Sequence, residues 1–425
     1  MTRWLRSTGR ETFASLRIRN FRLFFMGQGT SQVGNWMTLL AQSLLVLSLT
    51  NSGVALGLLA AAQFGPVLLV GPWAGLIADR SDKRKLLMRV QSIAMLQSFA
   101  LAVLVFSGSP PVWAIYALAS IGGLTIAFDN PARRAFVVEM VPEADVPNAV
   151  SLNSALMTSS RVIGPAVAGL LVATAGFGWA FLADALSYIA VLGSLAMIRT
   201  SELRPAPVTP RGKGQVREGL RYAHSVTALW VPLVMMAVIG TLAFNFSTVV
   251  PLFVTRDLGG TLTSYTILFS VLALGSLVGA LAVARRTHVT VRTVAHNAIG
   301  FGVAMAAFAL SPGWWMAVPV GLVVGFTSIG FLTSSTAIVQ MEAEPMMRGR
   351  VLALQAMLFL GSTPIGGPIL GWVSQSLGAR VGLLVGATAC FGAGAWGLAE
   401  VRRARPGAAV PTDGAAAVAS IAAGR

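Results

Sequence analysis

The chain has 425 residues, of which 55% are hydrophobic and only 11% are charged, and its mean hydropathy is +0.74. A soluble domain averages about one quarter charged residues, and the continuous apolar runs lack the period-two alternation of a β-barrel, so both classes are excluded. The net charge of +16 is not a nucleic-acid footprint, because 28 of the 31 Lys and Arg lie in or beside the N-terminal tail, alternate loops and the C-terminal tail.

That charge bias is the positive-inside pattern of a polytopic membrane protein. It predicts that both termini are cytoplasmic and that the number of spans is even. Residues 1–20 combine arginines with scattered apolar side chains, which predicts a cytoplasmic, partly interfacial segment. Six apolar runs within 21–198 are long enough to cross a bilayer. They cover about 21–49, 54–78, 86–106, 112–128, 149–174 and 179–197, with a polar join over 129–148.

A long hydrophilic stretch, residues 199–226, divides the chain into two halves. It predicts a cytoplasmic linker with a short amphipathic helix around 216–224. Six more apolar runs follow within 227–400, at about 229–254, 264–284, 291–310, 314–337, 351–373 and 381–398. Residues 401–425 are rich in Ala, Gly and Arg without an amphipathic period, so we expect a disordered cytoplasmic tail.

The two halves are similar to each other. Val-Glu-Met at 138–140 matches Val-Gln-Met at 339–341, an offset of 201 residues. The charged loop 75–85 has only a degenerate counterpart, in which Gly279 is followed by Arg285 and Arg286 without a matching carboxylate. An internal repeat of this kind is typical of transporters.

Several motifs resemble those of one family. The stretch 75–85, Gly-Leu-Ile-Ala-Asp-Arg-Ser-Asp-Lys-Arg-Lys, resembles the signature loop of the major facilitator superfamily, with Asp82 in place of the usual second glycine. Further similarity to its drug and siderophore exporter branch, which includes the enterobactin exporter and macrolide-efflux proteins, lies at 129–134, 147–153, 161–169 and 244–252. The resemblance covers about 21–400. It implies an all-α membrane protein with twelve transmembrane helices in two pseudo-symmetric six-helix bundles.

The loop motif predicts a cytoplasmic gate made by Gly75, Asp79, Arg80 and Arg84. Asp79 closes the second span, where a carboxylate can accept hydrogen bonds from a helix N-terminus or pair with an arginine. Such contacts would favour the state that is closed on the cytoplasmic side. The alternative is that these charges only set the topology.

Intramembrane charges are the second group of candidates. Arg161 lies inside the fifth span, where a cation costs about 3 kcal/mol, so it should face a cavity or a partner. Its depth matches that of Asp129, which predicts an Asp129–Arg161 contact. Arg133 belongs to the motif that follows Asp129. Asp184 is shallower and is expected to be either an outer proton site or a hydrogen-bonded packing residue.

Small residues and a proline follow Arg161 in the same span. Gly164, Pro165 and Gly169 predict a bent helix that approaches its neighbours closely. The resemblance implies an exporter motif here, whereas packing alone is the alternative.

Polar stripes on two spans predict the substrate cavity. In the first span, Gln28, Gln32, Asn35 and Gln42 fall within about 80 degrees of one another around the helix. In the seventh span the polar stripe and its aromatic neighbour are Thr241, Phe244, Asn245 and Thr248. Hydrogen bonding between helices is the alternative for both stripes.

These features predict a secondary active transporter in the bacterial inner membrane. It would export amphiphilic small molecules as a monomer, with no cofactor or metal and with a proton gradient as its energy source. No phosphate-binding Gly-rich loop and no catalytic constellation is found, so neither an ATP-driven pump nor an enzyme is expected. Asn35 stands near where relatives of the branch place an acid, so uniport or uptake stays open, as does a scaffold or lipid translocator.

Overall fold

The computed structural model describes residues 13–204, 215–283 and 289–403, and these form fourteen α-helices with no strand. The predicted all-α architecture is therefore confirmed. The first half contains α2 (Arg19–Thr50), α3 (Gly53–Arg80), α4 (Lys83–Phe106), α5 (Val112–Glu139), α6 (Val146–Thr174) and α7 (Phe177–Ala196). The second half contains α9 (Thr227–Leu242), α10 (Phe246–Leu252), α11 (Leu262–Val283), α12 (Val291–Ala309), α13 (Trp314–Glu342), α14 (Pro345–Ser376) and α15 (Ala379–Arg403).

Short turns join the helices, and polar residues set where they begin and end. Asn51 ends α2 in the left-handed conformation with φ 44°, and the Ser52 side chain then caps α3. Asp82 caps α4 by accepting a hydrogen bond from the backbone N–H of Lys85 at 3.0 Å. A side chain that caps a helix N-terminus explains why this position can carry Asp where the family motif has a glycine.

Eleven of the described helical segments are long and apolar enough to cross a membrane. The segment at the remaining predicted span, 291–310, is α12, which packs between α13 and α15 like its neighbours. Its hydropathy is lower because Arg292, His296 and Asn297 lie in its first two turns. The linker contributes α8 (Gln215–Ser225), which agrees with the amphipathic helix expected around 216–224.

The polar join predicted over 129–148 is wrong in its first half. Helix α5 continues through Pro131 to Glu139, and only residues 140–145 form the connection. The helix continues because Phe136 and Val137 are buried against the bundle, with 0% and 1% of their surface exposed. Burial of one apolar face stabilises a helix beyond the bilayer as well as inside it.

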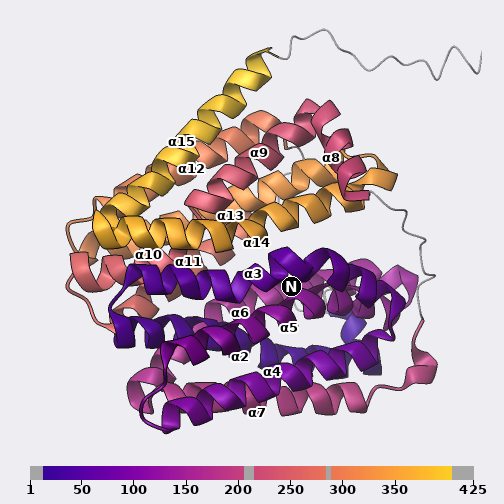
Figure 1. Ribbon diagram of the computed structural model, residues 1–425. Helices are drawn as coiled ribbons and strands as arrows, with labels where there is room; N and C mark the ends of the chain where they lie inside the picture. The colour runs from indigo at the N-terminus through magenta and orange to yellow at the C-terminus, as the bar shows by residue number, and fades with distance from the viewer. Residues whose placement is uncertain (1–12, 205–214, 284–288, 404–425) are drawn as a thin grey trace, which may run out of the picture.

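The two halves lie one against the other, with the N-terminal half below and the C-terminal half above in Figure 1. Helix α3 packs along α14, α6 packs on α11, and α10 contacts both α2 and α3. A close approach joins the start of α3 to the last turns of α14, where a Cβ on Gly57 would lie 2.5 Å from the carbonyl oxygen of Gly367. We call this end, which also holds the turns at 51–52 and 377–378, the far end.

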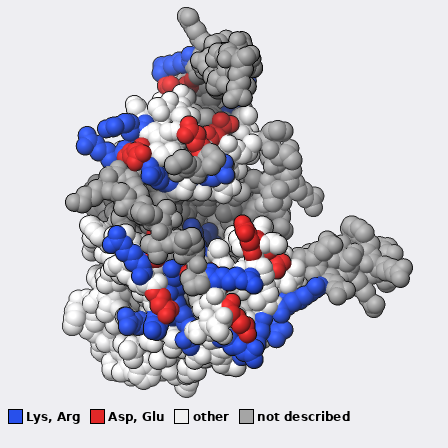
Figure 2. Space-filling view, turned by 90° about the vertical axis from the view of Figure 1, so that its right-hand side faces the viewer, with Lys and Arg blue, Asp and Glu red and all other residues white. Residues whose placement is uncertain are grey.

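Polar contacts also join the halves at the far end. The backbone N–H of Gly53 donates to Gln375 Oε1 at 2.8 Å, and Arg256 donates both to Gln375 Oε1 and to the carbonyl oxygen of Asn51. The opposite end, which we call the basic end, carries α8 and the 81–82 turn. Figure 2 shows Lys and Arg spread over both halves on that face.

Parts of several predicted segments lie outside the described residues. These are 1–12 of the N-terminal segment, 205–214 of the linker, Arg285 and Arg286 of the degenerate loop copy, and 404–425 of the tail.

Candidate functional site

A buried ion pair lies at the centre of the N-terminal half. Arg133 Nη2 lies 2.9 Å from Asp129 Oδ2, one turn apart on α5, and only 4% and 11% of the two side chains are exposed. Asp129 Oδ1 also accepts a hydrogen bond from Gln91 of α4 at 2.7 Å. Arg133 donates further bonds to Asn130 Oδ1 at 2.8 Å and to Met157 Sδ of α6 at 2.9 Å. Both charges are therefore compensated by neighbours on three helices.

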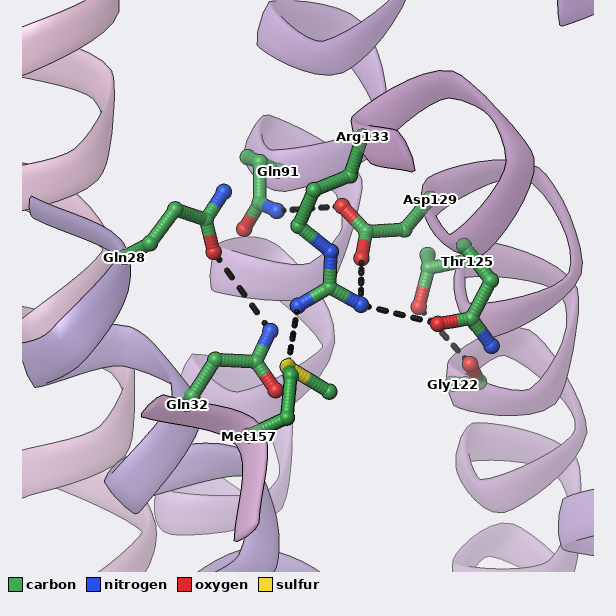
Figure 3. A network of polar contacts seen from close by, with 9 residues as sticks. Gln28, Gln32, Gln91, Gly122, Thr125, Asp129, Arg133 and Met157 are labelled. Carbon is green, nitrogen blue, oxygen red and sulfur yellow. Dashed lines mark hydrogen bonds and ion pairs between the residues drawn. The ribbon is translucent and has the colours of Figure 1, made fainter. Parts of the chain in front are cut away.

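Two glutamines of the predicted stripe lie beside this network (Figure 3). Gln32 Nε2 donates to Gln28 Oε1 at 3.4 Å, and both side chains are buried. In the close-up their amides lie on the side of the Arg133 guanidinium that faces α2, opposite Asp129. The stripe on α2 thus faces the interior of its own bundle, where the buried pair lies.

The contact predicted between Asp129 and Arg161 is wrong. Asp129 is engaged by Arg133 and Gln91, whereas the Arg161 guanidinium lies over the Trp36 ring, 4.9 Å from its centroid. The two residues share a depth, but a match in depth leaves the direction around each helix axis open. Among the described residues no carboxylate forms an ion pair with Arg161.

Asp184 is buried in a separate cluster. Its Oδ2 accepts hydrogen bonds from Thr38 of α2 and Ser98 of α4, both at 2.7 Å, while Oδ1 is buried without a hydrogen-bond partner. The side chain is 1% exposed. Of the two predicted roles, packing through hydrogen bonds has a direct structural basis, and the free Oδ1 leaves a position for a proton.

The predicted gate residues lie together at the basic end. Gly75 is in the last turns of α3 and half-buried, as is Asp79, while Arg80 is exposed. Arg84 donates to the carbonyl oxygens of Leu195 at 2.6 Å and Ala196 at 3.0 Å, which are the last turn of α7. A cation at a helix C-terminus is stabilised by the helix dipole, so Arg84 ties α4 to α7.

A second ion pair supports the same end. Lys83 Nζ lies 3.1 Å from Glu139 Oε1, and the two side chains are 11% and 5% exposed. The partners found for Lys83 and Arg84 all belong to the N-terminal half. In this state Lys83 and Arg84 therefore join helices of one half.

The small residues of α6 lie where helices approach closely. A Cβ on Gly164 would lie 2.5 Å from the Trp36 Cβ of α2, so this glycine lets α6 approach α2. Gly169 faces Thr266 of α11 in the other half in the same way. Pro165 is buried inside the helix. Close packing, including packing between halves, is therefore the structural basis of this motif.

The seventh predicted span is broken. Helix α9 ends at Leu242, and α10 starts at Phe246 and passes into a π-helical turn, Phe253–Asp257. Asn245 bridges the break by donating its Nδ2 to the carbonyl oxygen of Thr241 at 2.7 Å. Discontinuous helices in transporters occur where the backbone lines a binding site or a moving part.

The predicted cavity residues differ in accessibility. Asn245 and Thr248 are 2% and 1% exposed, and Asn245 Oδ1 and Thr248 Oγ1 have no hydrogen-bond partner. Asn35 and Thr241 are partly exposed. Phe244 is also partly exposed and packs against Phe359 with ring centroids 5.1 Å apart. The four predicted cavity residues of the seventh span thus surround the helix break, and Asn245 and Thr248 are inaccessible in this state.

Sequence reasoning missed several residues of these clusters. Gln91 and Met157 hold the buried pair, and Gln63 of α3 donates to Gln42 Oε1 at 2.7 Å. Trp36 was missed as the partner of Arg161. The spacing of Asp129 and Arg133 at i and i+4 was a usable signal for their pairing.

Comparison with known proteins places the chain among membrane transporters. Residues 10–410 match the family model described as Transmembrane secretion effector. Macrolide efflux protein A of Streptococcus pyogenes is 23% identical over 352 residues, which are 81% of this chain and 87% of that protein. Enterobactin exporter EntS of Escherichia coli is 25% identical over 83% of this chain and 84% of that protein. The staphyloferrin A transporter of Staphylococcus aureus is 34% identical, but the match spans only 40% of this chain and 44% of that protein.

Solved structures show the same fold. A bacterial homologue of the human lysosomal transporter Spinster, in an inward-facing and unoccupied conformation, superposes with a TM-score of 0.73 at 15% identity. The superposition covers 90% of this chain and 97% of that chain. At this identity the likeness concerns the fold alone.

Proposed function

Because the chain belongs to the Transmembrane secretion effector family of the major facilitator superfamily, we propose that it exports amphiphilic small molecules, drugs or siderophores among them, by alternating access. The coarse activity, transport of small molecules across a lipid bilayer, follows from the family. The direction and the substrate class are the proposal. They rest on relatives named as macrolide efflux protein and enterobactin exporter.

The observation that carries the proposal is the contrast between the two ends of the molecule. The halves meet through backbone contacts and hydrogen bonds at the far end, whereas at the basic end the partners that the described residues give Lys83 and Arg84 lie within their own half. The basic end would be cytoplasmic by the positive-inside rule. This state would then receive substrate from the cytoplasm, and an exporter would release it after the far end opens.

Buried carboxylates support a proton gradient as the energy source. Asp129 and Asp184 lie inside the N-terminal half, and Asp184 Oδ1 has no hydrogen-bond partner. Intramembrane acids commonly carry protons in transporters. Protonation of either acid would alter a hydrogen-bonded cluster that joins α2 to α4 or α4 to α5, which would couple proton binding to helix packing.

Reconstitution in liposomes tests the proposal. With the interior made acidic relative to the medium, inside-out molecules should accumulate hydrophobic dyes, macrolides or siderophores from a panel, and a protonophore should abolish the accumulation. An Asp184→Asn variant should bind substrate but lose the response to the gradient. Transport that ignores the gradient would refute antiport and favour uniport. Movement only toward the basic end would refute export and favour uptake.

A further inference from the structure

Two N–H donors lie together without acceptors in the N-terminal half. The Nε of Arg161 and the Nε1 of Trp36 are both buried, and neither has a hydrogen-bond partner. The guanidinium lies over the indole ring at 4.9 Å. A cation over an aromatic face gains some stabilisation, but it does not satisfy the N–H groups, whose burial without acceptors is costly.

In the part of the chain that the structure describes, no carboxylate pairs with Arg161. Asp129 Oδ2 is paired with Arg133, and Asp184 Oδ2 accepts from Thr38 and Ser98, while its unpartnered Oδ1 faces Gly34 of α2. The six predicted spans of the C-terminal half contain no Asp or Glu at all. An arginine in the interior of a membrane protein needs an anionic or strongly accepting partner, which the described residues do not supply to Arg161.

Arg161 is also placed where a ligand can reach it. The residue as a whole is partly exposed although its Nε is buried and it lies in the middle of α6, which packs on α11 of the opposite half. Gly164, one turn away, brings α6 onto the Trp36 side of α2. The two donors therefore lie at one contact between helices, and their positions are held by the packing of that contact.

From this geometry we propose that Arg161 and Trp36 form the anion-recognition point of the substrate site, so that the transported amphiphiles carry a carboxylate or a comparable anionic oxygen. This inference rests on the proposed transport function and specifies its substrate class. A guanidinium offers two parallel N–H groups to a carboxylate, and the indole N–H can donate to the same group. The Trp36 ring also offers an apolar face to the rest of an amphiphile.

The test compares one fluorescent amphiphile in two charge states, dansyl-phenylalanine and its methyl ester, on the purified full-length protein. Charge-assisted hydrogen bonds predict that the wild type binds the carboxylate about 10- to 100-fold more tightly than the ester. Arg161→Gln should bring this ratio close to one, because it weakens binding of the carboxylate far more than binding of the ester. Trp36→Phe keeps the ring and removes only the N–H, so it should lower the ratio by a smaller factor.

Two further variants keep the test decisive. Arg161→Lys keeps the positive charge but loses the two parallel N–H groups of the guanidinium, so it should retain part of the preference for the carboxylate. It takes the place of Arg161→Gln if that variant does not fold. Arg89→Gln removes an exposed arginine of α4 and should keep the wild-type ratio. A wild type that binds the ester as tightly as the carboxylate, or that binds neither, would overturn the inference, as would an unchanged ratio in Arg161→Gln.

Liposome export separates this inference from the proposed function. Export of the ester and the carboxylate at equal rates, with no effect of Arg161→Met, would overturn the anion preference and leave export standing. A protein that binds the carboxylate through Arg161 but moves neither probe across the bilayer would overturn the proposed function and leave the binding inference intact.

Discussion

The buried pair of Asp129 and Arg133 gives the sharpest prediction about stability. Asp129→Asn leaves the Arg133 side chain, of which 4% is exposed, with neutral acceptors alone, among them Asn130 Oδ1 and Met157 Sδ. Arg133→Gln leaves the Asp129 carboxylate with Gln91 as its donor. Each single change thus leaves one charge buried without its counter-charge, whereas the double variant leaves none.

The magnitude follows from the cost of a broken buried pair, about 3–5 kcal/mol of unfolding free energy. The lower end applies here because each partner keeps at least one other hydrogen bond. The double variant should lose only about 1–2 kcal/mol, since a buried ion pair contributes little over a neutral replacement. The two changes are therefore expected to be non-additive by at least about 2 kcal/mol.

Thermal unfolding of the purified protein in detergent, followed by the loss of helical circular dichroism, provides the assay. The midpoints should fall in the order wild type, double variant, single variants. The exposed pair of Arg199 and Glu202, with side chains 60% and 42% exposed, is the control, and Arg199→Gln should shift the midpoint little. Single variants that unfold like the wild type, or a double variant that unfolds below both, would refute the reasoning.

Three further predictions concern the helix contacts. Gly57→Leu places a Cβ 2.5 Å from the carbonyl oxygen of Gly367 and should therefore open the far end. The opening should appear as longer distances between spin labels on α3 and α14, attached in a cysteine-free background. Unchanged distances would contradict the assigned contact. Asn245→Ala removes the bond to the carbonyl oxygen of Thr241 and should lower the unfolding free energy by about 1–2 kcal/mol, with Ser247→Ala in the same segment as the control. Arg84→Ala should speed backbone amide hydrogen exchange in the last turn of α7, while exchange in α4 stays as in the wild type. Equal protection of that turn in variant and wild type would exclude the contact assigned between Arg84 and α7.

The spans could be predicted from sequence because hydrophobicity and length alone decide which segments enter a bilayer. The turns at 51–52 and 81–82 can be predicted from the sequence as well, because Ser52 and Asp82 are residue types that cap the N-terminus of the helix that follows. The break in the seventh helix could not be predicted. It falls at Ala243, Phe244 and Asn245 inside a continuous apolar run, with neither Gly nor Pro at the break itself.

The partner of Asp129 was mispredicted for a related reason. Depth along a span follows from counting residues, but the direction of a side chain around the helix depends on packing. The prediction of a polar join over 129–148 also left out the helical turn of α5 that places Asp129 beside Arg133. The end of α5 is set by burial of Phe136 and Val137 on neighbouring helices, which a hydropathy pattern alone does not report.

The glycine contact between α3 and α14 has a consequence for the transport cycle. Where α3 and α14 meet at Gly57 and Gly367, backbone touches backbone with no side chain between them, so this part of the contact can separate without rotamer changes. The hydrogen bonds of Gln375 and Arg256 lie at the rim of the same contact, where water can replace them as the helices part. A contact built in this way separates by helices moving apart as rigid bodies, so substrate or ion binding can reverse it in each turnover without repacking side chains at the glycines.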